Sequence, residues 1–167
     1  MARLVEAVYF DSDVWIRALE QEGPVADNCR DCIKCVEQYS LVVVLSTILP
    51  MEVLGHNLEE LVSSCGPRRA KPRSVDPKVI ELASLNRRIF QVKRNTDSKT
   101  PKSPKPLNLG DSIHLATAAV ENCRSFVAVD GDYDTHADFA KREFNMEILK
   151  PEKFLERYGF QRSLLED

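Results

Sequence analysis

The sequence predicts an α/β fold, a three-layer α/β/α sandwich with a mainly parallel central sheet. Short apolar segments rich in β-branched residues alternate with longer segments of helical periodicity, which is typical of βαβ units. The segment Ser40–Leu45 (SLVVVL) is apolar at consecutive positions, as in a parallel strand that is buried on both faces. The length of 167 residues suits a single domain, because domains typically hold ~100–200 residues.

The amino-terminal part is expected to contain two strands and three helices. Asp11 or Ser12 is placed to cap the first helix and Ser46 or Thr47 the third, because such side chains accept hydrogen bonds from the first helical amides. The expected strands are Leu4–Phe10 and Ser40–Leu45, and the expected helices are Asp11–Glu20, Val25–Tyr39 and a third that runs to about Cys65.

The carboxy-terminal part begins with a basic, proline-rich segment at about residues 67–106. Within it, Val75–Phe90 has helical periodicity, whereas Lys93–Pro106 contains three prolines and many polar residues and is expected to be a loop. The remaining expected helices are Asn108–Asn122, Tyr133–Glu143 and Pro151–Tyr158, and the remaining expected strands are Ser125–Val129 and Met146–Leu149.

Charge is unevenly distributed, although the net charge is only −3. Between Arg68 and Lys105, twelve Lys and Arg face three Asp and Glu, a balance of +9, whereas the rest of the chain has eleven against twenty-three, a balance of −12. A local excess of positive charge is typical of a nucleic-acid-binding surface. A solvated basic helix and loop is the alternative.

The five cysteines are an odd number, and the amino terminus lacks a signal-peptide pattern, which argues for a cytoplasmic protein without a disulfide framework. No apolar run approaches the ~18 residues of a membrane span. Cys29, Cys32 and Cys35 are spaced three apart, but no second CxxC or close His pair completes a zinc site. We expect them to pack on the apolar face of their helix; metal or redox chemistry is the alternative.

Four acidic residues lie where expected strands end or the following helices begin. Asp11 and Asp130 follow the first and third expected strands, Glu52 lies in the helix after SLVVVL, and Asp111 opens the helix after the basic segment. In open parallel sheets, the reactive crevice lies outside the carboxyl ends of the strands. We therefore expect all four carboxylates near the same edge of the sheet.

Carboxylates gathered at one edge repel each other, and a divalent cation offsets that repulsion. A ligand set of oxygens alone points to Mg²⁺ or Mn²⁺ rather than zinc. Taken singly, each acid has a structural alternative: Asp11 and Asp111 as helix caps, Glu52 as a solvated residue, and Asp130 as a turn former. Their joint placement favours the metal site.

Four segments together resemble the PIN-domain nuclease family. They follow the family's order over nearly the whole chain, and GDSIHLATAA is the most specific piece. Where the family often has Ser or Thr two residues before its fourth acid, this chain has Ala128. The segments are VYFDSDVWI (Val8–Ile16), STILPMEVL (Ser46–Leu54), LGDSIHLATAA (Leu109–Ala119) and FVAVDGDYD (Phe126–Asp134).

The resemblance implies a PIN-like fold and a metal-dependent endoribonuclease that hydrolyses RNA phosphodiester bonds with Mg²⁺ or Mn²⁺. It also implies the metal ligands: Asp11 at the centre, Glu52 second, Asp111 third, and Asp130 fourth and bound through water. Ser12 corresponds to the small hydroxyl residue that follows the family's first acid.

Three further residues are accessory candidates beside these acids. Asp13 and Asp132 are candidates for contact with the metal or its waters, but capping or turn formation is the favoured role of each. His114 is a candidate for orienting a ligand or contacting substrate, but structural packing is its favoured role. His56 and His136 have no supporting constellation.

The basic segment offers contacts to RNA phosphates, with Arg87, Arg88, Lys93 and Arg94 as candidates. Single-domain members of the family are similar to VapC-type toxins, which an antitoxin protein holds inactive and which commonly dimerise. The resemblance therefore implies an antitoxin partner and a homodimer, for which the apolar face of Val25–Val36 is the available surface.

Two other functions compete with the nuclease. The segment DSDV (Asp11–Val14) also resembles the haloacid dehalogenase superfamily, which implies a phosphatase with Asp11 as nucleophile and Asp13 as acid/base. Ser46 or Thr47 would then bind phosphate, and Asp130 or Asp132 would hold the metal. The other alternative is a non-catalytic RNA-binding module with a degenerate acidic site, which Ala128 favours.

Overall fold

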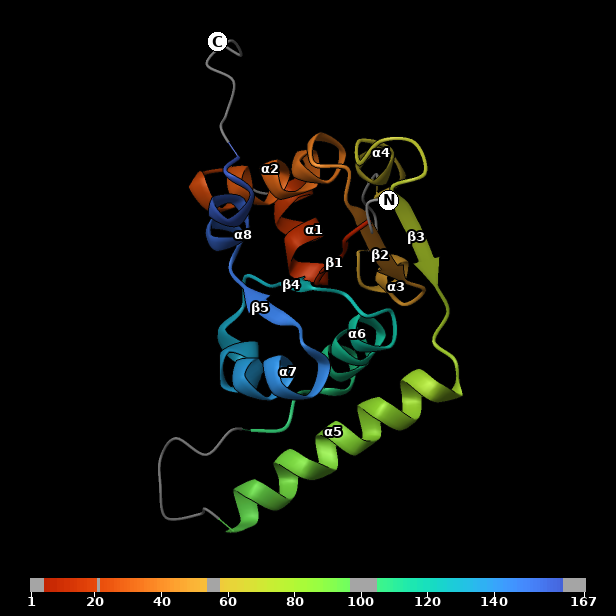
Figure 1. Ribbon diagram of the computed structural model, residues 1–167, viewed down its shortest axis with the longest axis vertical. Coiled ribbons are helices and arrows are strands. Elements are labelled where there is room, and N and C mark those ends of the chain that lie inside the picture. Colours follow the sequence, from red (N-terminus) through yellow and green to blue (C-terminus); the bar gives the residue numbers. More distant parts are fainter. Residues whose placement is uncertain (1–4, 21, 54–57, 97–104, 161–167) are drawn as a thin grey trace.

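The computed structural model describes residues 5–20, 22–53, 58–96 and 105–160 (Figure 1). They form a five-stranded sheet in the order β3-β2-β1-β4-β5, and every pair of neighbouring strands is parallel. The prediction of an α/β fold with a mainly parallel sheet is therefore confirmed. The strands are β1 (Ala7–Phe10), β2 (Val42–Ser46), β3 (Ala70–Arg73), β4 (Ser125–Val127) and β5 (Glu147–Leu149).

Helices cover both faces of this sheet (Figure 1). On one face lie α1, α2, α4 and α8, and on the other lie α5, α6 and α7. The bounds are α1 (Ser12–Glu20), α2 (Pro24–Gln38), α3 (Leu49–Glu52), α4 (Leu58–Ser63), α5 (Pro77–Thr96), α6 (Leu109–Val120), the 3₁₀ helix η1 (Gly131–His136), α7 (Ala137–Phe144) and α8 (Pro151–Tyr158). None of the helices in the described ranges is long and apolar enough to span a membrane.

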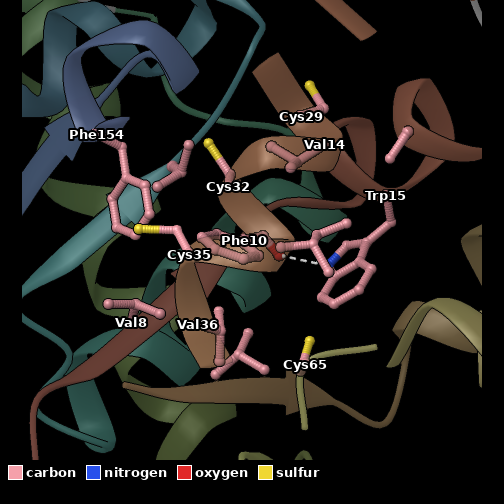
Figure 2. Close-up of a cluster of buried hydrophobic side chains, with 14 of the residues drawn as sticks. Val8, Phe10, Val14, Trp15, Cys29, Cys32, Cys35, Val36, Cys65 and Phe154 are labelled. Atoms are coloured by element: carbon pink, nitrogen blue, oxygen red, sulfur yellow. Dashed lines mark hydrogen bonds between the residues drawn. The ribbon is translucent and has the colours of Figure 1, made fainter. Parts of the chain in front are cut away.

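The first core lies between the sheet and the α1, α2 and α8 layer. Val8 and Phe10 of β1 point into it, and the Trp15 indole N–H donates to the Phe10 carbonyl at 3.2 Å (Figure 2). Cys29, Cys32 and Cys35 are fully buried in the same cluster (Figure 2).

These three cysteines pack as apolar residues, as expected. Burial raises the pKa of Cys29 and of Cys35 to about 12, so their thiols remain protonated and unreactive. The apolar face of α2 is thus inside the protein. This corrects the expectation that the Val25–Val36 face serves as a dimer interface, since Ala26, Cys29, Ile33 and Val36 are all buried there.

The second core lies on the opposite face of the sheet and is aromatic. Tyr9, whose neighbours in β1 face the first core, stacks on Phe126 with ring centroids 5.3 Å apart. Phe126 also contacts the Tyr133 ring, at 4.8 Å. Two buried tyrosines therefore flank Phe126, and both carry a hydroxyl that needs a polar partner.

Several expected boundaries differ from the structure. The expected helix to Cys65 is wrong, because α3 ends at Glu52 and Val53 leaves the helical region with φ −95° and ψ 52°. Its N-cap is Ile48, not Ser46 or Thr47. Helix α5 continues to Thr96 and so overlaps the expected loop from Lys93.

One strand was not expected. The sequence AKPR forms β3 because it pairs with β2 at the edge of the sheet, with Val43 opposite Ala70 and Leu45 opposite Pro72. Proline is tolerated at such an edge, where one side of the strand needs no ladder donor.

Candidate functional site

The four expected acids lie near the carboxyl ends of the central strands. Asp11 directly follows β1, and its amide donates to the Val127 carbonyl of β4 at 2.9 Å. Asp130 follows β4 and forms the N-cap of η1. Glu52 ends the short helix after β2, and Asp111 lies in the first turn of α6. The topology therefore gathers residues that are far apart in the sequence.

Asp11 is the most buried of these acids, with 3% of its surface exposed. The Tyr133 hydroxyl donates to its Oδ1 at 3.0 Å. The pKa of Asp11 is raised from 3.8 to about 6: burial is the main cause and the charges of Asp111 and Asp13 contribute, against the opposing effects of His114 and Tyr133. Asp11 is thus a carboxylate in a place that disfavours its charge.

Glu52 is held by the fully buried His114. The distance from His114 Nε2 to Glu52 Oε2 is 2.5 Å, and the side chain of Glu52 is 32% exposed. Burial raises the pKa of Glu52, but hydrogen bonds from His114 and Ser12 and the charge of His114 outweigh it, so the net pKa is lowered. Glu52 is therefore ionised at neutral pH.

The other oxygen of Glu52 lies against the start of α6. A Cβ added at Gly110 would lie 2.9 Å from Glu52 Oε1. Because this is closer than a real Cβ approaches, only glycine leaves room for the carboxylate in its present position.

Asp111 shares the Tyr133 hydroxyl and the neighbourhood of His114. Its amide donates to Asn108 Oδ1 at 2.8 Å, so Asn108, not Asp111, caps α6. Burial raises the pKa of Asp111, and the charge of Asp132 raises it further, while hydrogen bonds with Asn108 and Tyr133 and the charge of His114 lower it.

Asp13 and Asp130 form a second carboxyl pair at the edge of the site. Burial raises the pKa of Asp13, and the charge of Asp130 and a hydrogen bond with it add to the rise. Asp130 is exposed, and the Lys150 ammonium fixes its loop by donating to the carbonyls of Val129 at 3.1 Å and Asp130 at 2.7 Å. Asp132 is also exposed.

The structure thus brings together Asp11, Glu52, Asp111, Asp13 and Asp130 with Ser12 and His114. Three important residues were missed: Tyr133, Gly110 and Tyr9. Tyr133 and Gly110 stand inside the motifs DGDYD and GDSIH, next to the acids themselves, and this adjacency was the available signal. Tyr9 stands in VYFD, two residues before Asp11, so the same kind of signal was available for it.

Other expected residues lie elsewhere or outside the described residues. Arg87 and Arg88 are exposed on α5, where they line a pocket of about 330 Å³ with Ser84, Gln91 and Pro106. The backbone of Lys93 and Arg94 is part of α5, but their side chains are outside what the structure describes. His56 lies outside the described residues altogether. His136 is buried against Phe90, with ring centroids 4.0 Å apart.

The hydroxyls that the phosphatase alternative requires already have hydrogen-bond partners within the protein. Ser46 is buried, its Oγ accepts from the Ile48 amide at 3.4 Å, and its side chain also bonds to Tyr9. Thr47 Oγ1 accepts from the Val75 amide at 3.3 Å.

The donors at this edge suit a hard divalent cation. They are carboxylate oxygens, the ligands that Mg²⁺ and Mn²⁺ prefer, and the buried charge of Asp11 calls for a positive partner. Among the described residues, no group of three or more Asp, Glu, His or Cys side chains is arranged as a ready metal site. The carboxylate oxygens therefore suit Mg²⁺ or Mn²⁺ by their chemistry, but the described side chains are not already arranged around a metal position.

Substitution of Tyr133 by Phe tests the support of Asp11. We expect the pKa of Asp11 to rise above about 6, because the hydrogen bond from Tyr133 is one of the contacts that lower it. The metal-free variant should lose about 1.5–3 kcal/mol of stability at pH 8, where Asp11 is ionised, and less at pH 5. Carboxyl-carbon NMR titration and urea unfolding measure the two effects.

Tyr158→Phe is the matched control for this substitution. Its hydroxyl donates to Glu6 at 2.7 Å, away from the acidic site, so its loss should leave the titration of Asp11 unchanged. An unaltered Asp11 titration in Tyr133→Phe would contradict the role given to Tyr133.

Comparison with known proteins supports the fold. No family model and no curated protein sequence match the chain. Among solved structures, a PilT N-terminus domain protein from the hyperthermophilic archaeon Sulfolobus solfataricus P2 is similar over 94% of this chain and 97% of that chain, with 12% identity and a TM-score of 0.51. VapBC2 from Rickettsia felis, bound in that structure to a DNA fragment from its promoter, matches 86% of this chain and 98% of that chain, with 11% identity and a TM-score of 0.49. At such identities the likeness concerns the fold, and the chain therefore has the fold of the PilT N-terminus, or PIN, domain.

Proposed function

We propose that this protein is a metal-dependent endoribonuclease. The observation that carries the proposal is the buried Asp11 carboxylate, whose pKa is raised to about 6 by burial and, in smaller part, by the nearby acids Asp111 and Asp13. Folding alone does not favour such crowding. Helix capping does not account for Asp111, because Asn108 already caps α6.

Asp11, Glu52 and Asp111 would hold Mg²⁺ or Mn²⁺, with Asp130 acting through water. Such an ion supplies a more acidic bound water and neutralises charge on the phosphate. The protein's own side chains prepare this site. Glu52 is kept ionised by His114, and the Tyr133 hydroxyl, whose pKa burial holds far above its ordinary value, keeps its proton and orients Asp11.

RNA is the proposed substrate because the sequence resembles that of PIN-domain ribonucleases, and the acidic site also needs positive charge nearby to attract such a polyanion. Arg87 and Arg88 offer it from α5, the helix that packs against α6, where Asp111 lies. Contacts to phosphate add affinity and salt dependence rather than sequence preference. The sequence resemblance to VapC-type toxins further supports a toxin role with an inhibitory antitoxin protein as partner.

The test is cleavage of a broad panel of structured and single-stranded RNAs by the purified protein. We expect cleavage with Mn²⁺ or Mg²⁺ and none after chelation by EDTA, and we expect Asp111→Asn to be inactive while it stays folded. Asp27→Asn is the matched control, because Asp27 lies on α2 in an ion pair with Arg30.

Other outcomes separate the competing functions. Hydrolysis of p-nitrophenyl phosphate with a trappable phosphoryl-aspartate at Asp11, and no RNA cleavage, would show a phosphatase. RNA binding that survives Asp11→Asn, with no cleavage by the wild type under any metal, would show a binding module. Either result would overturn the nuclease.

A further inference from the structure

A buried chain of hydrogen bonds leads from the second core to Glu52. The Tyr9 hydroxyl lies 2.5 Å from His114 Nδ1, and His114 Nε2 lies 2.5 Å from Glu52 Oε2. Tyr9 and His114 are 1% and 0% exposed. A carboxylate can only accept, so Nε2 carries a proton, and Nδ1 shares a hydrogen bond with the Tyr9 hydroxyl.

The backbone around Glu52 gives the side chain little support. Helix α3 spans only Leu49–Glu52, Glu52 is its last residue, and Val53 has already left the helical conformation. Met51, its neighbour, is 70% exposed. The position of the Glu52 carboxylate therefore depends on what its own oxygens contact.

Both oxygens of Glu52 have a defined contact. Oε2 accepts from the His114 N–H, and Oε1 lies against Gly110; the Ser12 side chain also bonds to this carboxylate. The imidazole cannot turn away, because Tyr9 occupies its other nitrogen and the Tyr9 ring is itself stacked on Phe126. One oxygen is thus fixed and the other is presented at the start of α6, beside Asp111.

We propose that His114 is a positioning residue, which, with Tyr9 behind it, fixes Glu52 as a ligand for the divalent cation of the proposed nuclease. This inference rests on the proposed function. It assigns His114 no contact with substrate and no proton transfer. Loss of a residue that hydrogen-bonds to a metal ligand in this way typically lowers metal affinity by about 10- to 100-fold.

The test measures Mn²⁺ binding to the intact protein by electron paramagnetic resonance of the free ion, without any activity assay. We expect His114→Leu to weaken Mn²⁺ affinity by about 10- to 100-fold. His114→Gln keeps an N–H that can reach Glu52 and should recover most of the loss. The double variant Tyr9→Phe/His114→Leu removes the Tyr9 hydroxyl together with the imidazole that it contacts, so that this hydroxyl is not left without the imidazole, and should bind as weakly as His114→Leu.

Thr117→Val is the matched control, because Thr117 is buried on the same helix one turn further on and bonds only within it, to the Ile113 carbonyl at 2.8 Å. Wild-type affinity in Thr117→Val is expected. Equal weakening by Thr117→Val, or wild-type affinity in folded His114→Leu and the double variant, would overturn the positioning role while leaving the nuclease standing. A wild-type protein that binds no Mn²⁺ would overturn both.

Discussion

Replacement of Asp11 by Asn is expected to abolish metal-dependent RNA cleavage while making the metal-free protein more stable at pH 8. Loss of a hydrogen-bonded partner of a metal ligand costs about 10- to 100-fold, so loss of the central ligand itself should cost at least ~100-fold. Asn keeps the size of Asp11 and its acceptor for the Tyr133 hydroxyl, but it removes the buried charge.

The stability gain follows from the pKa of Asp11. The native pKa is raised from 3.8 to about 6, so the native state binds this proton more tightly than the unfolded state. The resulting stability is fully present below about pH 4 and is lost as the pH rises through about 6. Its size is on the order of 3 kcal/mol, and burial of Asp11 keeps solvent from screening most of it.

Urea unfolding of the metal-free protein between pH 4 and pH 8 measures this effect. Wild type should lose stability as the pH rises, and Asp11→Asn should lose much less, so that the variant is the more stable protein at pH 8. Asp138→Asn, an exposed change on α7, should follow the wild-type curve. Equal slopes for wild type and Asp11→Asn would contradict the buried, charge-disfavouring position of Asp11.

The path of the chain through the sheet was largely predictable. Asp11 and Asp130 follow apolar strands, and a parallel sheet brings their carboxyl ends to one edge. The helix expected at Asn108–Asn122 was also recognisable, because it carries a long apolar face, although its cap is Asn108 and not Asp111. The cysteine spacing correctly indicated packing, since helical periodicity accounts for it without a metal.

The contacts that shape the site were not predictable from one sequence. His114 meets Glu52 across 62 residues and Tyr9 across 105, and no local pattern encodes such pairs. Strand β3 was missed because AKPR has no strand propensity of its own and depends on pairing with β2. The prolines after Lys93 predicted a loop from that residue, but the nearest of them is Pro101, and α5 continues to Thr96 before it.

Ala128 shows how structure can replace an expected contact. The resemblance predicts a hydroxyl side chain at this position, but Ala128 is buried in the second core. A hydroxyl still reaches the acids, from Tyr133, which bonds to Asp11 instead. The departure at Ala128 is therefore weak evidence for a degenerate site, because a hydrogen-bond donor is present from another residue.

Substitution of Gly110 by Ala, at the start of α6, is expected to lower the rate of RNA cleavage while the fold remains stable. The added Cβ would lie 2.9 Å from Glu52 Oε1, and the end of a flexible side chain yields more easily than a helix backbone. The fold should therefore survive, and α6 itself gains up to about 1 kcal/mol, because Ala is a better helix former than Gly. Displacement of the carboxylate by about 1 Å should cost on the order of 100-fold in cleavage.

Glu52→Asp provides the internal control, because its shorter side chain withdraws the carboxylate from Gly110. In that background, Gly110→Ala should cost much less than it does in wild type, and a double-mutant cycle on cleavage rates measures the difference. Thermal unfolding of all four proteins shows whether the fold is retained. Additive losses would mean that Gly110 acts on cleavage without touching Glu52, and the position assigned to this carboxylate, held between His114 and the start of α6, would then be wrong.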